Sequence, residues 1–173
     1  MINSNMRVRK VVISSLLAAM ICVATTFFHV PLGGNGGYVH IGDAFIYLSA
    51  SILPLPYAMI SAAVGASLAD LFSGATVWVI PTMIIKPILV LFFTSRNIKI
   101  LCFRNTLATI FAGVAGVLLY CLADYLLFGN FAAAFYMSFV SLLQPVGSAV
   151  VFLLLAGALD RIKFKSKVSF NKI

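Results

Sequence analysis

The feature that most limits the fold is a series of long apolar runs separated by short breaks. The first extends from Val11 to Phe28 and the last from Ala132 to Leu159. A run of about 18 or more apolar residues can cross the hydrocarbon core of a bilayer as a helix. Only 9% of the 173 residues are charged, against about a quarter in soluble domains. The chain cannot cover a water-facing surface, so we expect an all-α polytopic membrane protein.

The apolar runs divide into six predicted spans within a single membrane domain, residues 1–173. The spans cover residues 11–28, 43–53, 57–72, 77–93, 106–128 and 132–159. The second span is too short to cross alone, and Pro54 and Pro56 stop it because proline removes a helix donor and restricts its neighbour. We therefore expect a short helix there, completed by irregular backbone that is buried in the bundle.

The basic residues indicate the orientation of the bundle. All but Lys86 of the 12 Lys and Arg residues fall before span one, between spans four and five, or after span six. Six spans place these three segments on one side, which the positive-inside rule makes cytoplasmic. Both termini are then cytoplasmic. The basic N-terminus could also begin a signal peptide, but the run after it is too long and lacks an obvious cleavage site, so we interpret it as an uncleaved span.

Four ionisable side chains lie inside predicted spans: Asp43, Asp70, Lys86 and Asp124. Such residues are costly in a membrane, so each is a functional-site hypothesis by default. The predicted orientation places all four in the outer half of the bundle. Asp70 and Lys86 could also simply neutralise one another across spans three and four.

Hydrogen-bonding and aromatic side chains share helix faces with these four residues, because residues at i and i+4 are neighbours on a helix. One such stripe is Trp78, Thr82 and Lys86. Together with residues of the first outer loop, the stripes predict a polar pocket with flat stacking surfaces that opens outward. The predicted binding residues are Asn35, Tyr38, His40, Asp43, Tyr47, Asp70, Trp78, Thr82, Lys86, Tyr120, Asp124 and Gln144. Individually, Trp78 and Tyr38 also fit an interfacial aromatic belt, and Gln144 could bond carbonyls freed by Pro145.

Small residues form rows on two spans. Span one carries Ser14 with Ala18 and Ser15 with Ala19, and span three carries a longer row that starts at Ala58. Small side chains let helices approach closely in lipid. The rows therefore indicate either docking of a partner helix or packing within the bundle.

Several function classes lack their motifs. The sequence has no Walker loop, no HExxH, no GxSxG and no DxDxDG. A membrane enzyme is therefore disfavoured, and active transport would need an ion gradient or a partner. The net charge of +8 lies at the predicted membrane edges, so it does not indicate nucleic-acid binding. Three cysteines show neither metal spacing nor a disulfide pattern, and we assign them a structural role.

Three segments resemble the substrate-capture S components of energy-coupling factor (ECF) vitamin transporters. The residues that carry the resemblance are Gly36–Ala44, Ser67–Gly74 and Pro81–Lys86. The chain looks most like the subgroup assigned to hydroxymethylpyrimidine, pyridoxine or queuosine-precursor uptake. The resemblance covers nearly the whole chain in length, six-span layout and motif order.

The resemblance implies a multi-pass protein of the bacterial cell membrane that binds a small heteroaromatic vitamin at its outer face. It implies that the first loop, with Gly33–Gly37, acts as a gate. It also implies docking onto a transmembrane coupling subunit that bears two cytoplasmic ATPases, so that partner subunits hydrolyse ATP and no cofactor is bound covalently. Family members dock through an Ala-xxx-Ala row on span one, where this chain offers Ser14, Ala18, Ser15 and Ala19.

A second hypothesis remains open beside this one. The chain could be a stand-alone proton-coupled carrier that uses Asp43, Asp70 or Asp124 as proton sites. Dependence of uptake on ATPase and coupling subunits would separate the two.

Overall fold

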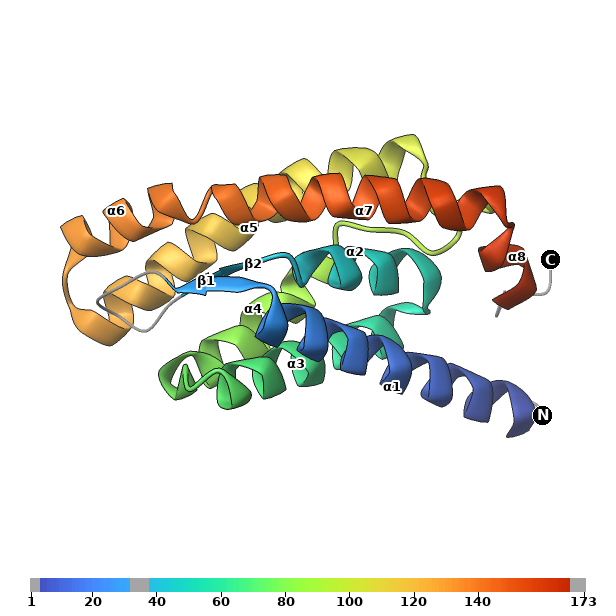
Figure 1. The fold of residues 1–173 in the computed structure, drawn as a ribbon, viewed down its shortest axis with the longest axis horizontal. Coiled ribbons are helices and arrows are strands. Elements are labelled where there is room, and N and C mark those ends of the chain that lie inside the picture. Colours follow the sequence, from blue (N-terminus) through green and yellow to red (C-terminus); the bar gives the residue numbers. More distant parts are fainter. Residues whose placement is uncertain (1–3, 32–37, 169–173) are drawn as a thin grey trace.

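A computed structural model describes residues 4–31 and 38–168, and these residues form a bundle of helices (Figure 1). In chain order the elements are α1 (Ser4–Phe27), β1 (His29–Pro31), β2 (Tyr38–His40), α2 (Asp43–Ile52), α3 (Leu55–Phe72), the 3₁₀ helix η1 (Thr76–Trp78), α4 (Val79–Val90), α5 (Phe103–Phe128), α6 (Phe131–Val140), α7 (Leu143–Arg161) and α8 (Phe164–Val168). The start of α1 and the short helix α8 lie at one end of the bundle, and the two strands and α6 lie toward the other (Figure 1).

Four helical segments are long and apolar enough to cross a membrane: Asn5–Phe27, Leu55–Phe72, Phe103–Phe128 and Phe131–Arg161. Two shorter apolar helical segments, Asp43–Ile52 and Thr76–Val90, complete the bundle among the described residues. These six segments correspond in position to the six predicted spans. The second is as short as expected, because Leu53 is extended and Pro54 precedes the next helix.

Small residues bring α1 and α3 into close contact. A Cβ atom added at Gly65 would lie 2.5 Å from the carbonyl oxygen of Ala18. Ser14 and Ser61 join the two helices through their hydroxyls, 2.8 Å apart, and Ser61 also donates to the carbonyl of Ser14 at 2.9 Å. The row on α3 therefore packs within the bundle, as small residues do where helices meet in lipid.

The short helix α2 forms the centre of the bundle. All of its residues except Phe45 are buried. It contacts α1, α3, α4 and α7. A helix surrounded in this way can be shorter than the membrane is thick, because the irregular backbone beside it is buried in protein.

The last predicted span, 132–159, corresponds to one membrane-length segment, Phe131–Arg161, but the segment contains a break that was not predicted. The structure has two helices, α6 and α7, with a turn at Ser141 and Leu142. Pro145 has no N–H to donate to the carbonyl of Ser141, and the N–H of Gln144 donates to that carbonyl instead, at 3.1 Å. The tighter turn interrupts the helix between Ser138 and Gln144, the two polar residues on either side of the break.

The first outer loop contains a feature that the sequence analysis did not predict. Residues His29–Pro31 pair with Tyr38–His40 as two antiparallel strands, with Val30 opposite Val39. The predicted glycine-rich gate between them, which includes Asn35, lies outside the described residues. The hairpin extends from the end of α1 to the start of α2 and fixes the positions of Tyr38 and His40.

The connection between α4 and α5 is irregular but hydrogen-bonded. The side chain of Asn105 accepts from the N–H of Thr94 and donates to the carbonyls of Thr94 and Ile100, at 2.9–3.0 Å. The carboxylate of Asp160, at the end of α7, accepts the N–H groups of Ile100 and Leu101, each at 2.8 Å. These bonds hold the loop against α5 and α7.

Candidate functional site

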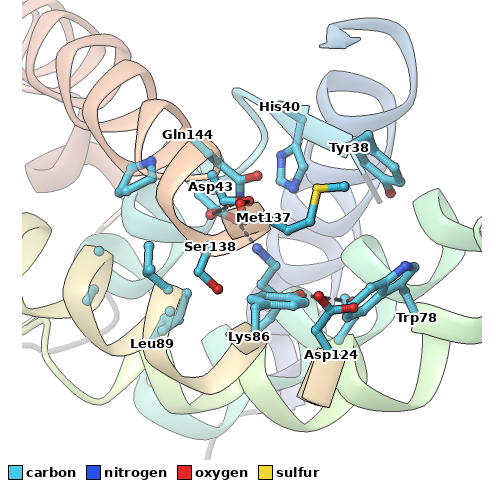
Figure 2. A pocket seen from close by; sticks show the side chains of 18 of the residues that line it. Tyr38, His40, Asp43, Trp78, Lys86, Leu89, Asp124, Met137, Ser138 and Gln144 are labelled. Atoms are coloured by element: carbon cyan, nitrogen blue, oxygen red, sulfur yellow. Dashed lines mark hydrogen bonds and ion pairs between the residues drawn. The ribbon is translucent and has the colours of Figure 1, made fainter. Parts of the chain in front are cut away.

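A pocket lies among β2, α2, α3, α4, α5, α6 and α7 (Figure 2). Every predicted binding residue except Asn35 lines it, and Asn35 lies outside the described residues. Residues from distant parts of the sequence therefore come together around one space. The lining includes Tyr38, His40, Asp43, Tyr47, Asp70, Trp78, Thr82, Lys86, Tyr120, Asp124 and Gln144.

A buried ion pair occupies one wall of the pocket. The Nζ of Lys86 lies 2.6 Å from Oδ1 of Asp43, and the two side chains are only 2% and 5% exposed. Nε2 of Gln144 donates to the other oxygen, Oδ2, at 2.7 Å. Both oxygens of Asp43 are thus satisfied, as a buried charge requires. The pair joins α2 to α4, and Gln144 adds α7.

Of the two alternatives for Asp70 and Lys86, their direct pairing is wrong, because the ion-pair partner of Lys86 is Asp43. Gln144 also does not serve the backbone near Pro145, since its side-chain amide donates to Asp43. Helical periodicity gave the correct faces for these residues. It could not give the relative rotation and depth of α2, α3 and α4, which decide which carboxylate meets the ammonium.

Asp70 binds the hairpin through one carboxylate oxygen, and its other oxygen is buried beside the pocket. The hydroxyl of Tyr38 donates to Oδ1 of Asp70. Oδ2 is buried and has no hydrogen-bond partner among the described residues. Burial and the neighbouring carboxylate raise the pKa of Tyr38, so its hydroxyl keeps the proton that it donates. An unpartnered buried acceptor costs about 1–3 kcal/mol, which makes Oδ2 a place where a ligand donor would be stabilising.

Aromatic rings line another part of the pocket, next to Lys86. The rings of Trp78 and Tyr120 lie 5.9 Å apart, and Phe128 lies 6.2 Å from Trp78. The hydroxyl of Tyr120 is 2.9 Å from Oγ1 of Thr82, and the ammonium of Lys86 lies 5.1 Å from the Tyr120 ring centroid. Such a wall offers π faces to a flat ligand and a cation close to them.

His40 lies in the pocket as a neutral side chain. Its Nδ1 accepts the N–H of Gly42 at 3.0 Å, which requires the proton to be on Nε2. Burial lowers the pKa of His40 to about 3. His40 therefore acts as a fixed hydrogen-bonding group and not as a charge at neutral pH.

Some lining residues were not predicted. Met137 and Ser138 come from α6, and Ala112, Gly113 and Gly116 come from α5. Two glycines three residues apart beside Ala112 do mark a small face, which the sequence analysis could have used. Met137 and Ser138 carried no such signal, because their contribution depends on the break between α6 and α7.

The two small rows of α1 face different surroundings. Ser14 is buried and bonds Tyr57 and Ser61 of α3, and the carbonyl of Ala18 lies against Gly65. Ser15 and Ala19 lie on an adjacent, exposed face of α1, among exposed apolar residues. Docking of a partner through Ser14 and Ala18 would require α1 to leave α3, whereas Ser15 and Ala19 are accessible.

The membrane-length helices and the polar pocket define a small integral membrane protein with a candidate ligand site within its helix bundle. A family model described as "ECF-type riboflavin transporter, S component" matches residues 5–161, and the chain belongs to this family. Proteins of this class are the substrate-binding subunits of ECF importers and work with a membrane coupling subunit and ATPases. No curated protein matches the chain.

Proposed function

We propose that this chain captures a small heteroaromatic nutrient, neutral or cationic, in the pocket lined by Asp43, Asp70, Lys86 and Tyr120. The observation that carries the proposal is the buried, unpartnered Oδ2 of Asp70 in a pocket walled by aromatic rings. A ring that stacks on Trp78 or Tyr120 and donates an N–H or O–H to Asp70 satisfies both features. Most of the binding area then comes from apolar faces and the orientation from a few polar groups.

The size of the pocket favours a compact ligand. Its volume is about 100 Å³, which is room for roughly 7–10 waters at 10–15 Å³ each. A heterocycle of one ring, or of two fused rings, matches this space. Riboflavin, which the family description names, has three fused rings and a ribityl chain. Hydroxymethylpyrimidine, pyridoxine and a queuosine precursor are better matched.

The charge of the pocket favours a ligand without a negative group. Three carboxylates and one ammonium line it, and the ammonium of Lys86 is already paired with Asp43. A phosphate or carboxylate on the ligand would meet surplus negative charge in a low-dielectric site, which is strongly unfavourable. Amino, hydroxymethyl and ring N–H groups would instead find acceptors.

Transport by this chain requires partners under the same proposal. We expect six membrane crossings with cytoplasmic termini in a bacterial cell membrane, a transmembrane coupling subunit and two ATPases that hydrolyse ATP. The exposed positions Ser15 and Ala19 offer the close approach that a partner helix needs in lipid. Uptake that persists without the partner subunits would instead support the proton-coupled carrier.

The binding proposal is tested by calorimetry of the purified protein with hydroxymethylpyrimidine, pyridoxine, a queuosine precursor and riboflavin. Asp70→Asn should weaken binding of the ligand by about 10- to 150-fold, the equivalent of a lost charged hydrogen bond of roughly 1.5–3 kcal/mol. Asp160→Asn, at the far end of the bundle, should leave affinity unchanged. Tightest binding of riboflavin, or unchanged affinity in Asp70→Asn, would contradict the proposed ligand class.

The docking proposal is tested by replacing Ser15 and Ala19 together with tryptophan. Ligand affinity should remain near that of the unmodified protein, while co-purification with the coupling subunit is lost. The matched control replaces Val146 and Val150, which are exposed on α7 at the same spacing. Equal loss of the partner in both double variants would show that bulk anywhere on the bundle disrupts assembly.

A further inference from the structure

A second cavity lies at the end of the bundle that holds the start of α1 and the short helix α8 (Figure 1). Its volume is about 470 Å³. It lies between the α2–α3 connection, the α4–α5 connection and α8, and it is separate from the outer pocket. Its polar lining is Thr94, Ser95, Arg96, Arg104 and Lys165, and its apolar lining includes Leu53, Leu55, Leu91 and Phe93.

Lys165 is the unusual residue of this cavity. Only 7% of it is exposed, and its Nζ has no hydrogen-bond partner among the described residues. An ammonium that is buried without a hydrogen-bond partner is unfavourable, because it loses hydration and the more distant charge of Asp160 offsets only part of that cost. Burial lowers the pKa of Lys165 accordingly. An anion entering the cavity would remove this cost.

No acidic side chain lines this cavity among the described residues. Its only acidic residues are four aspartates, and Asp43, Asp70 and Asp124 line the outer pocket. Asp160 accepts the N–H groups of Ile100 and Leu101 and does not line the cavity. Asp160 lies close enough to Lys165 to offset part of its charge, but the cavity has three cations, Lys165, Arg96 and Arg104, so positive charge remains in excess.

The remaining cations suit a phosphate group. Arg96 and Arg104 are exposed at the rim, and guanidinium groups bind phosphate oxygens through paired N–H donors. Arg104 also lies in the first turn of α5, which begins at Phe103, and the N-terminal end of a helix favours anions. The apolar half of the lining would accept the glycerol and first acyl carbons of a lipid.

We propose that this cavity binds a phosphate group through Lys165, Arg96 and Arg104. The phosphate belongs to an anionic phospholipid headgroup or to a soluble phosphate, and the two sources share the same recognition chemistry. The site would lie at the membrane interface, where basic residues attract anionic lipids. It is independent of the ligand that the outer pocket binds.

The test compares the thermal stability of delipidated protein in neutral detergent with and without added anion. One arm adds inorganic phosphate, and the other adds phosphatidylglycerol, with phosphatidylcholine as its zwitterionic control; native mass spectrometry counts the bound lipids. The variants are Lys165→Met and Arg96→Gln, and the matched control is Lys99→Met, an exposed lysine of the same loop that does not line the cavity.

Without anion, Lys165→Met should be at least as stable as the unmodified protein, because it removes a buried unpaired charge. With anion, the unmodified protein and Lys99→Met should gain stability and bind at least tenfold more tightly than Lys165→Met and Arg96→Gln. Stabilisation by phosphatidylglycerol alone identifies a lipid site, and stabilisation by phosphate identifies a site for soluble phosphate. Equal responses of all variants, or no response to either anion, overturn the proposal. Because Arg96 is exposed, its variant tests the site without altering a buried residue.

Discussion

Removing Lys86 should destabilise the protein strongly, because its ammonium neutralises a buried carboxylate. The Nζ lies 2.6 Å from Oδ1 of Asp43, and Coulomb's law at an effective dielectric of about 20 gives roughly 6 kcal/mol of attraction. Desolvation offsets part of this, but breaking a buried pair by removing one partner costs about 3–5 kcal/mol, because the other charge stays buried. Lys86→Met leaves the carboxylate of Asp43 with the amide of Gln144 as its donor.

Asp43→Asn should lose a similar free energy of unfolding, because it leaves the ammonium beside the ring of Tyr120. The double variant contains neither charge. It should therefore be no less stable than either single variant, which corresponds to a coupling energy of about 3 kcal/mol. This double-mutant cycle separates the ion pair from the packing of the two side chains.

The assay is unfolding by sodium dodecyl sulfate in mixed micelles, followed by tryptophan fluorescence. The chain has one tryptophan, Trp78, and it lines the same pocket. Lys99→Met, on the exposed loop, should change stability by less than about 0.5 kcal/mol. The reasoning fails if each single variant loses less than about 1 kcal/mol, or if the double variant loses the sum of the two.

Two further outcomes are expected. Acid should destabilise the fold through His40, whose pKa is lowered to about 3 from 6.5. Below pH 6.5 the unfolded chain binds a proton at His40 and the folded chain does not. The free energy of unfolding should therefore fall by about 1.4 kcal/mol by pH 5.5. His40→Asn, which can still accept the N–H of Gly42, should abolish that slope in pH-dependent melting, and an unchanged slope would assign it to another group. Gly65→Ala should cost about 1–3 kcal/mol, because the new Cβ meets the backbone of Ala18. In the same melting assay Gly147→Ala, with open space around it, should cost much less, and equal losses would refute the close packing of α1 on α3.

The pocket could be predicted from the sequence because its residues are expensive anywhere else in a membrane. Asp43, Asp70, Lys86 and Asp124 interrupt apolar runs, and the cost of such residues in lipid forces them into the interior. Once they converge, hydrogen-bonding neighbours one turn away, such as Thr82, converge with them. The high free-energy cost of exposing ionisable side chains to lipid therefore makes the polar lining predictable.

The connections were less predictable because they depend on small energy differences. One missing donor at Pro145 divides the last span into α6 and α7, and only that break brings Met137 and Ser138 to the pocket. The hairpin of β1 and β2 has three residues in each strand, which is too few for an alternating pattern to be recognised. Both features add residues to the site that periodicity alone does not place.

Under the proposed function, Asp70 couples the stability of the hairpin to the binding of the ligand. Its Oδ1 accepts from Tyr38 of β2, and its buried Oδ2 has no hydrogen-bond partner in the part of the chain that the structure describes. The carbonyl of His40, in the same strand, accepts from Ser148 of α7, so the hairpin is bonded to two helices at once. A ligand that donates to Oδ2 fixes the carboxylate in the rotamer that also accepts from Tyr38. Coupling free energies are reciprocal. If the ordered hairpin raises the affinity for the ligand, the bound ligand therefore stabilises the hairpin by the same free energy. Under the proposed function, ligand capture and the stability of the hairpin therefore depend on the same carboxylate.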